Sequence, residues 1–549
     1  MVRFDNNLDI CSKLGLALNY KGNEANIISS AYLKWGLNCT NYLLGDWSFI
    51  LYDYQQKVLF IARDQIGSAN LFYYFDSGSL VCSDNLALLL KHPKIPRVLN
   101  PAAILQNQNG ISKDNQTYYK DIFRLLPGHQ LTVTDRELKI VNYWLPISGS
   151  LIRYKTASEY AEHFLSLYSD AISKRLTQKA GITLSGGLDS TSVAHLAASQ
   201  YNSELHALTW IPQKSLTKEI QIEGRELSEI VRARTLTSKF NKLIHHEVIG
   251  GISGVTQNIE NCLTIFSQPE YVNLHIQELY KRAEDLSLDT ILTGEWGNIS
   301  VSFKGNWNLF LKEMIYERSL DKFVSQLHNW KKNNGVGYFK AILKLLLLPK
   351  LSSFRGNGNA TNILNAEAVY ENRHLKMSQS PHLDNFILKN SFPTKSIVMA
   401  MRSDYLGKLE QFSNSYGIQS RTPVMDKELL DFCISIPQEQ YLSEGQEKSL
   451  FKKAFKNKLP DEILFNKNRG LQGGDLIMRY KNDLPSIKSM YNEIQQSPLA
   501  RYWINLRKIE ISLSRLNSAK INPSLFHDVN IVRKGLTLGT FLKRFGDEK

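Results

Sequence analysis

The run Ser185–Ser190, which reads Ser-Gly-Gly-Leu-Asp-Ser, constrains the fold more than any other feature of the sequence. It stands between a short apolar stretch, Gly181–Leu184, expected to be a strand, and Thr191–Ala198, expected to be a helix. Two glycines allow a tight turn and a close approach of the backbone to an anion. Successive N–H groups at a helix start attract negative charge. The run therefore predicts an anion site where open α/β sheets bind ligands, at the carboxyl ends of strands.

Strands and helices are expected to alternate on both sides of this run. Because such alternation is typical of a parallel sheet covered on both faces, the sequence predicts an α/β fold with a doubly wound sheet. From about residue 305 the chain is expected to be mostly helical, with a Gly- and Asn-rich loop at Ser352–Thr361. The further expected strands are 205–208, 243–248 and 290–293, and the further expected helices are 158–176, 223–239 and 274–286.

Residues 1 to about 145 have a different pattern, with short β-rich runs and turn residues between them. The 549 residues are too many for one hydrophobic core, so we expect two domains, 1–150 and 151–549. The first is predicted to be α+β. Its expected strands are 47–53, 58–62, 70–75 and 80–83, and its expected helices are 26–35 and 84–90.

Composition excludes several classes of protein. Hydrophobic residues make up 43% and charged residues 21% of the chain, as in ordinary globular proteins. The net charge of +14 is spread along the chain, so a solvated basic surface is at least as good an interpretation as a nucleic-acid face. Five scattered cysteines indicate neither a disulfide framework nor a zinc site. The longest apolar run, Ile342–Leu348, is too short to span a bilayer. We expect a cytoplasmic protein.

Ser185–Ser190 is not a Walker motif, because no Gly-Lys-Ser/Thr closes it. It resembles the PP-loop of ATP pyrophosphatases, which grips the pyrophosphate of ATP while a substrate oxygen attacks the α-phosphate. The resemblance implies ATP and Mg²⁺ as cofactors, with Asp189 as a metal ligand. The residues expected to bind the nucleotide are Ser185, Gly186, Gly187, Leu188, Asp189, Ser190, Leu184, Thr209 and Gly294. The alternative is a Gly-containing turn without a ligand.

Further segments resemble the asparagine synthetase family, in the family's order. The segments Gly45–Phe49, Ala62–Gly67, Leu71–Tyr74, Arg124–His129 and Tyr143–Trp144 are similar to its N-terminal class-II amidotransferase domain. This resemblance implies an Ntn-type sandwich remnant before the PP-loop domain. Three more segments, in the expected domain 151–549 with its helical C-terminal part, resemble segments of the family: Thr293–Asn298, Ser420–Asp426 and Gly445–Leu450.

Two residues in these segments are expected to be catalytic. Glu295 matches the family's acidic residue near the reacting carbonyl, and we expect it to position or deprotonate the attacking amine. Lys448 matches the lysine that stabilises charge on the departing pyrophosphate, although a solvated lysine is the simpler interpretation of the residue alone. Trp296 is expected to form a wall of the pocket or to be a core aromatic.

The chain departs from the family pattern at several positions. Asn298 replaces a Mg²⁺-ligating aspartate and Ile299 a glutamate of the Gly-Glu-Gly-Gly-Asp loop. An amide oxygen can still bind the metal, so Asn298 is a second expected ligand. Residue 2 is valine and the first cysteine, Cys11, falls in an expected helix. Since the family's nucleophile is an N-terminal cysteine, glutaminase activity is not expected, unless the start codon is misassigned.

Family members without that cysteine use an amine of their own substrate. Gly297–Ser302 and Arg469–Asp475 are similar to segments of the lasso-peptide macrolactam synthetases. The favoured hypothesis is therefore adenylation of an Asp or Glu carboxylate and intramolecular amide formation in a precursor peptide, with a leader-processing protein as partner. The alternatives are asparagine synthesis from aspartate and ammonia, an inactive relic that serves as a scaffold, and a tRNA-modifying PP-loop enzyme. The sequence does not indicate the oligomeric state.

Overall fold

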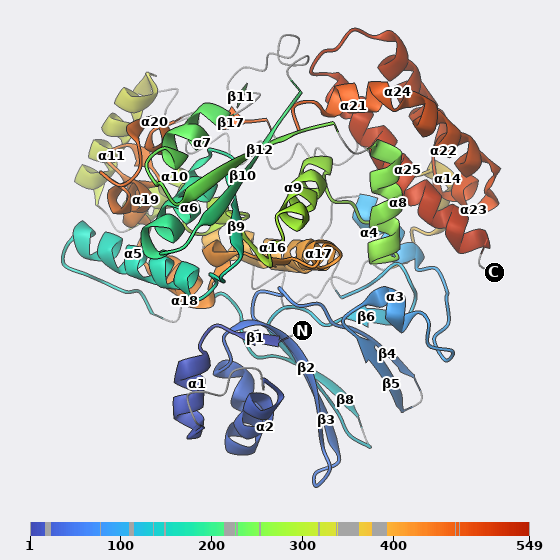
Figure 1. The fold of residues 1–549 in the computed structure, drawn as a ribbon, viewed down its shortest axis with the longest axis horizontal. Coiled ribbons are helices and arrows are strands. Elements are labelled where there is room, and N and C mark those ends of the chain that lie inside the picture. The colour runs from blue at the N-terminus through green and yellow to red at the C-terminus, as the bar shows by residue number, and fades with distance from the viewer. Residues whose placement is uncertain are drawn as a thin grey trace.

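A computed structural model gives the structure of the chain. It describes residues 2–16, 24–76, 78–108, 115–135, 137–147, 150–213, 225–226, 229–251, 254–316, 319–335, 337–338, 362–375, 392–466, 468–471 and 473–547. A β-rich N-terminal part lies below a parallel sheet, and the C-terminal helices gather at one side (Figure 1). The expected loop Ser352–Thr361 and the apolar run Ile342–Leu348 lie outside the described residues.

The N-terminal part is a sandwich of two antiparallel sheets. Neighbouring residues of β3 (Val58–Arg63) face opposite ways: Phe60 and Ala62 pack with helices α1 and α2, and Ile61 packs between the sheets. The period-two pattern of the sequence thus separates two cores. The first sheet has the order β1 (Val2–Phe4), β2 (Gly45–Asp53), β3, β7 (His129–Val133), β8 (Leu138–Asn142), and the second the order β5 (Ser79–Ser83), β4 (Phe72–Asp76), β6 (Ile122–Arg124). The helices of this part are α1 (Asn7–Leu14), α2 (Glu24–Trp35), α3 (Leu86–Leu89) and α4 (Pro101–Gln108).

The second sheet system is parallel throughout, with the order β12-β10-β9-β13-β14. The chain runs outward from β9 to β12 and then restarts on the other side of β9 with β13, so the switch point lies between β9 and β13. Ligands bind at such a point, beyond the carboxyl ends of the strands. The strands are β9 (Ala180–Thr183), β10 (Leu205–Ile211), β12 (Leu243–Ile249), β13 (Thr290–Leu292) and β14 (Gln419–Arg421).

Helices cover both faces of this sheet, which confirms the doubly wound prediction. One face carries the largest core, to which α5 (Ala157–Ser173), α6 (Leu188–Gln200), α7 (Ile230–Thr237), α18 (Lys427–Ser435) and α19 (Ser449–Ala454) contribute. The other face packs on α8 (Val255–Phe266), α9 (Leu274–Asp285) and α17 (Tyr405–Asn414).

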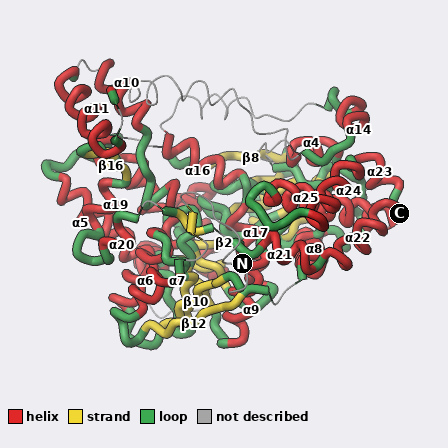
Figure 2. Tube along the Cα trace, turned by 90° about the horizontal axis from the view of Figure 1, so that it is seen from above, coloured by secondary structure: helices red, strands yellow, loops and turns green. Residues whose placement is uncertain are grey.

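The C-terminal helices form a further core together with the three-stranded sheet of the N-terminal part. Figure 2 shows α22–α25 at one end of the molecule and α10 and α11 at the other. No described helix combines the length and the apolarity needed to cross a membrane. The helices of this core are α14 (Ala366–Glu371), α21 (Leu476–Asn482), α22 (Leu484–Gln496), α23 (Pro498–Trp503), α24 (Leu506–Ser518) and α25 (Leu525–Asp547). The helices α10 (Trp307–Tyr316), α11 (Leu320–Asn334), α16 (Phe392–Arg402) and α20 (Asp461–Leu464) pack into the largest core instead.

Several boundaries differ from the sequence prediction, and two of these differences lie next to the PP-loop. The helix expected at 223–239 is confined to α7, because Arg225–Glu226 forms strand β11, which pairs in parallel with β17 (Arg469–Gly470). Because the partner strand β17 is so distant in the chain, the local sequence gives no sign that Arg225–Glu226 forms a strand. The helix expected at Thr191–Ala198 begins earlier, at Leu188, since the second glycine of the PP-loop already serves as its N-cap.

Candidate active site

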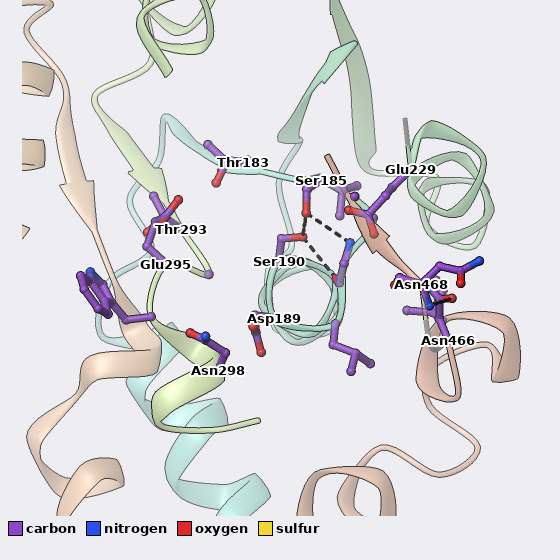
Figure 3. Close-up of a pocket in the computed structure, with 18 of the residues that line it drawn as sticks. Thr183, Ser185, Asp189, Ser190, Glu229, Thr293, Glu295, Asn298, Asn466 and Asn468 are labelled. Atoms are coloured by element: carbon purple, nitrogen blue, oxygen red, sulfur yellow. Dashed lines mark hydrogen bonds between the residues drawn. The ribbon is translucent and has the colours of Figure 1, made fainter. Parts of the chain in front are cut away.

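A cavity of about 1170 Å³ opens at the carboxyl ends of β9 and β13, where the sheet topology places a ligand site. The PP-loop lies in its centre. Glu295 and Asn298 lie to one side of that loop, and Glu229, Asn466 and Asn468 lie to the other (Figure 3). The cavity is larger than the roughly 300–1,000 Å³ of typical small-molecule sites. It therefore has room for a nucleotide and a second substrate.

The PP-loop is held in one shape by its own serines. The hydroxyls of Ser185 and Ser190 are 2.9 Å apart, and the Ser185 N–H donates to Ser190 Oγ at 3.1 Å. Gly186 has φ +88°, in the left-handed region, and a Cβ there would collide with the backbone of Glu229. Gly187 caps α6 without a side-chain hydrogen bond. The loop therefore presents the first amides of α6 to the cavity, as an anion site requires.

Arg232 stabilises the PP-loop through a hydrogen bond with its backbone. Its Nε donates to the Gly186 carbonyl at 3.2 Å, and its other nitrogens form ion pairs of 2.7 Å with Glu226 and 2.6 Å with Glu229. Gly470, on the neighbouring strand β17, is so close to Glu229 that a Cβ there would lie 2.5 Å from Glu229 Oε2. A guanidinium that orients a peptide group through fixed hydrogen bonds stabilises the loop conformation.

Asp189 lies at the start of α6 with an unsatisfied carboxylate. Its Oδ1 is buried without a hydrogen-bond partner. Burial raises the pKa of this carboxyl, whereas the charge of Lys448 and a hydrogen bond with Ser302 lower it. A buried acceptor without a partner requires an explanation, and a divalent cation supplies one, since Mg²⁺ takes one or two carboxylates together with phosphate oxygens. Asp189 therefore fits the expected metal.

Glu295 follows β13 and is the second acid of the site. Burial, and then the negative charge of Asp189, raise its pKa to about 7. The adjacent Gly294 approaches α6 so closely that a Cβ would lie 2.6 Å from the Ser190 nitrogen. This contact fixes the distance between the Glu295 loop and the PP-loop. A carboxyl whose pKa lies near neutrality suits a general base.

Lys448 reaches the same cavity from the start of α19. Its backbone is left-handed, with φ +60°, and its Nζ donates to Ser302 Oγ at 3.4 Å. Its charge acts on Asp189, as the direction of that pKa effect shows. Residues far apart in the chain thus place a lysine, two acids and an anion-binding loop around one space.

The remaining predicted residues lie in or next to the cavity. Leu184, Leu188 and Asn298 line it, and Asn298 stands on the 3₁₀ turn Gly297–Ile299 that faces Asp189. Thr209 does not line it: its side chain is buried, and its hydroxyl donates to the Leu184 carbonyl at 2.6 Å. Thr209 therefore stabilises β9 and β10 one layer behind the cavity wall, and its contact with a nucleotide stays a prediction.

The segment Arg469–Asp475 anchors part of the cavity wall. Asp475 pairs with Arg479 at 2.8 Å, and Arg479 makes two hydrogen bonds, of 2.8 and 2.7 Å, with Glu278. Glu278 also accepts from the Trp210 indole at 2.8 Å. Asp475 does not line the cavity; it holds, through this buried network, the aromatic ring that does. Gln472 lies outside the described residues.

Several lining residues were not predicted from the sequence. Trp210 could have been found, because it follows an expected strand at its carboxyl end. Glu229 has no such signal, since its role depends on the tertiary contact with Gly186. His275 is enclosed beside Arg479, and burial lowers its pKa to about 4, so it is neutral near pH 7. The other lining residues without a sequence prediction include Ile276, Leu279, Tyr280, Trp330, Asn333, Leu409, Asn466 and Asn468.

Comparison with known proteins agrees with this geometry. Residues 163–486 match the family described as asparagine synthase, and residues 13–144 match the glutamine amidotransferase domain family. The chain is 21% identical over 456 residues to glutamine-hydrolyzing asparagine synthetase 3 of Bacillus subtilis, which covers 81% of this chain and 70% of that protein. It is 23% identical over 506 residues to a probable glutamine-hydrolyzing asparagine synthetase of Schizosaccharomyces pombe, covering 85% of this chain and 71% of that protein.

A shorter part of the chain is similar to a protein that is named as an amidase. Amidase chyE of Penicillium rubens is 28% identical over 180 residues, which cover 32% of this chain and 26% of that protein. The asparagine synthase match spans more than half of the 549 residues and contains the PP-loop, Glu295 and Lys448. The chain therefore belongs to the asparagine synthase family of ATP-dependent ligases.

Proposed function

We propose that this protein adenylates the side-chain carboxylate of an Asp or Glu residue in a peptide and joins it to an amine of the same peptide. The observation that carries the proposal is the convergence of Asp189, Glu295 and Lys448 on one cavity around the PP-loop. The products are a macrolactam, AMP and pyrophosphate. ATP and a carboxylic acid substrate are what the family leads us to expect.

In the first step, a carboxylate oxygen of the substrate attacks the α-phosphorus of ATP. The bond between that phosphorus and the bridging oxygen to the β-phosphate breaks, and pyrophosphate leaves. The amides at the start of α6 and the Lys448 ammonium stabilise the charge on the leaving group, because both are fixed before the reaction begins. A bound Mg²⁺ would add charge neutralisation, with Asp189 and Asn298 as the residues that would hold it.

In the second step, an amine of the substrate attacks the acyl carbon, and AMP leaves. The attacking amine must lose a proton, and the Glu295 carboxylate accepts it. With a pKa of about 7, Glu295 is substantially ionised at neutral pH and is still basic enough to take the proton. When amine and carboxylate belong to one peptide, binding in the cavity also supplies proximity.

The size and lining of the cavity support a peptide substrate. Its volume of about 1170 Å³ exceeds typical small-molecule sites. The side opposite Glu295 carries Asn466 and Asn468, which give it a polar surface. Hydrogen bonds of Asn466 with the Asn468 backbone, and of the Asn468 carboxamide with Glu226, hold this surface in place. The proposal includes a precursor peptide and a leader-processing protein as partners.

A second candidate is the synthesis of asparagine from aspartate, with ammonia or glutamine as the nitrogen source. The similarity to glutamine-hydrolyzing asparagine synthetases over 81% and 85% of the chain favours it. The third outcome is an inactive relic, which is favoured by the amide at Asn298 in place of a carboxylate. Against a relic stand the unpartnered oxygen of Asp189 and the desolvated carboxyl of Glu295, because a site released from function has no reason to keep them.

The deciding experiment is pyrophosphate release from Mg·ATP by the purified protein. One reaction contains aspartate and ammonium, and a parallel reaction contains a linear peptide with an internal Asp or Glu. Release with the peptide alone, with loss of one water from the peptide mass, supports the proposal; release with aspartate and formation of asparagine supports the second candidate. If neither the peptide nor aspartate elicits pyrophosphate release, the proposal and the second candidate are both refuted. In Asp189→Ala, pyrophosphate release should fall below detection, while the midpoint of thermal unfolding stays close to that of wild type and shows that the fold is intact.

A further inference from the structure

Trp296 adopts a backbone conformation that disfavours its own side chain. It has φ 69° and ψ 4°, in the left-handed region, directly after Glu295. That conformation is strained for a residue with a Cβ, and glycine adopts it without this strain. Trp296 thus puts a large ring where the backbone favours a residue without a side chain.

A second cost falls on the same residue. The indole Nε1 is buried and has no hydrogen-bond partner, so the loss of its hydration is not compensated. The ring is held by packing: it meets Tyr405 edge to face, with ring centroids 5.6 Å apart. Strain and an unsatisfied donor at one residue beside the catalytic acid indicate a role in function, because stability alone would remove both.

Through Tyr405, the Trp296 ring joins an apolar wall of the cavity: Trp296 lines the cavity and packs against the largest core, and Tyr405 packs against that core and also against a second cluster. Ile276, Tyr280 and Leu409 belong to one buried cluster, against which Trp210 and Tyr405 pack. The Tyr280 hydroxyl is already hydrogen-bonded to Ser420 at 2.8 Å. His275, next to this wall, is neutral near pH 7 because burial lowers its pKa to about 4. Among the described residues that line the cavity, the cations are Lys448 and Lys452, on and beside α19.

This wall discriminates between two kinds of acid. Free aspartate carries an ammonium and a second carboxylate on its α-carbon. Each of these charges loses water against an aromatic wall, at a cost of several kcal/mol unless an opposite charge replaces it. An Asp or Glu residue inside a peptide has neutral amides at these positions, which lose less on desolvation. The wall therefore admits the second acid more readily than the first.

We propose that Trp296 is a specificity-determining residue, which excludes free amino acids and admits a carboxylate whose α-amine and α-carboxyl groups are already in amide bonds. The inference rests on the proposed function, since it names the acyl substrate of the same adenylation. It also specifies which residue makes the choice.

The test compares two acids that differ only in these charges: L-aspartate and Nα-acetyl-aspartate α-methylamide, with the corresponding glutamate pair. ATP–pyrophosphate exchange, measured without an amine, reports the adenylation step alone. Wild type should prefer the capped acid in kcat/KM. Trp296→Gly should lower that preference about 10-fold or more, because it opens space beside Glu295. Trp296→Phe keeps a ring at this position and should keep the preference within about threefold.

Trp296→Leu provides a milder change in case the glycine variant unfolds, and it should fall between the other two. Equal use of free and capped acids by wild type overturns the inference, and so does an unchanged preference in both the glycine and leucine variants. A wild-type protein that exchanges pyrophosphate with none of the four acids, and with no longer peptide, overturns the proposed function itself. Failure of the inference and failure of the proposed function are thus distinguishable.

Discussion

Replacing Glu295 by glutamine should abolish amide formation and at the same time stabilise the protein at alkaline pH. Burial and the charge of Asp189 raise the Glu295 pKa from 4.5 to about 7. The difference between these two values corresponds to about 3 kcal/mol of free energy. Glutamine mimics the protonated carboxyl in shape but cannot ionise, so Glu295→Gln removes this cost of burying a charge.

The pH window follows from the direction of the pKa effect. The carboxyl of the unfolded chain loses its proton around pH 4.5, whereas that of the folded chain keeps it until about pH 7. Wild type therefore loses stability as the pH rises between these values. The stabilisation by Glu295→Gln should be close to zero below pH 4.5, grow through the window, and reach at most about 3 kcal/mol above pH 7.

Wild-type activity should rise with pH around the Glu295 pKa of about 7, whereas wild-type stability falls as the pH approaches this value. If Glu295 is the base, wild-type kcat/KM for amide formation, which reports the pKa of the free enzyme, should be about a tenth of its plateau at pH 6, about half at pH 7 and about nine-tenths at pH 8. Glu295→Gln should lower the plateau about 10²–10⁴-fold. Chemical denaturation and single-turnover amide formation, each measured from pH 4 to 9, provide the two readouts.

A matched control is Glu247→Gln, at an exposed glutamate of β12 on the same sheet that does not line the cavity. Because it loses a surface ion pair with Arg234, this variant should be less stable by under about 1 kcal/mol, and it should leave the pH dependence of both activity and stability unchanged. The reasoning is refuted if the midpoint of the rise in wild-type activity with pH lies below pH 5.5, or if Glu295→Gln is no more stable than wild type at pH 8.

Three further variants test the other contacts of the site. Lys448→Met should lower the rate of ATP–pyrophosphate exchange about 10²–10³-fold, since it removes a fixed charge at the leaving group; an unchanged rate would show a solvated lysine. Gly294→Ala should lower stability by about 1–3 kcal/mol, because its Cβ would lie 2.6 Å from the Ser190 nitrogen; a neutral effect in thermal unfolding would contradict this packing. Asp404→Asn should cost about 3–5 kcal/mol, because two buried arginines lose their partner, whereas Asp9→Asn, in an exposed pair with Lys13, should cost under about 1 kcal/mol. Equal denaturation midpoints for these two variants would refute the argument for Asp404.

The architecture could be predicted because its signals are local. Apolar runs with a period of two or 3.6 residues mark each strand and helix around the PP-loop, and glycine marks the turn at Gly186. The short strand β14 was not predicted, since its three residues are a strand only through pairing with β13. The same holds for β11 and β17, which are joined across more than 240 residues.

The candidate site was predictable where a motif carries the chemistry. Ser185–Ser190, Glu295, Asn298 and Lys448 all line the cavity that the sequence led us to expect. Thr209 of β10 lies one layer behind the cavity wall, as its bond with the Leu184 carbonyl shows, and its contact with a nucleotide stays a prediction. Glu229 and Arg232 were not predicted at all, because their contacts depend on how α7 packs against the loop, and packing has no short-range pattern.

Buried ion pairs explain how the N-terminal sandwich contributes to a site it does not line. Arg421 of β14 forms ion pairs of 2.6 Å with both Asp5 and Asp46, at the start of the chain and in β2. Its carbonyl accepts from the Thr293 N–H at 2.9 Å, two residues before Glu295. Breaking one buried pair of this kind leaves a charge without a partner, at about 3–5 kcal/mol. The sandwich thus fixes the strand pair that precedes Glu295, and this contribution requires no glutamine hydrolysis.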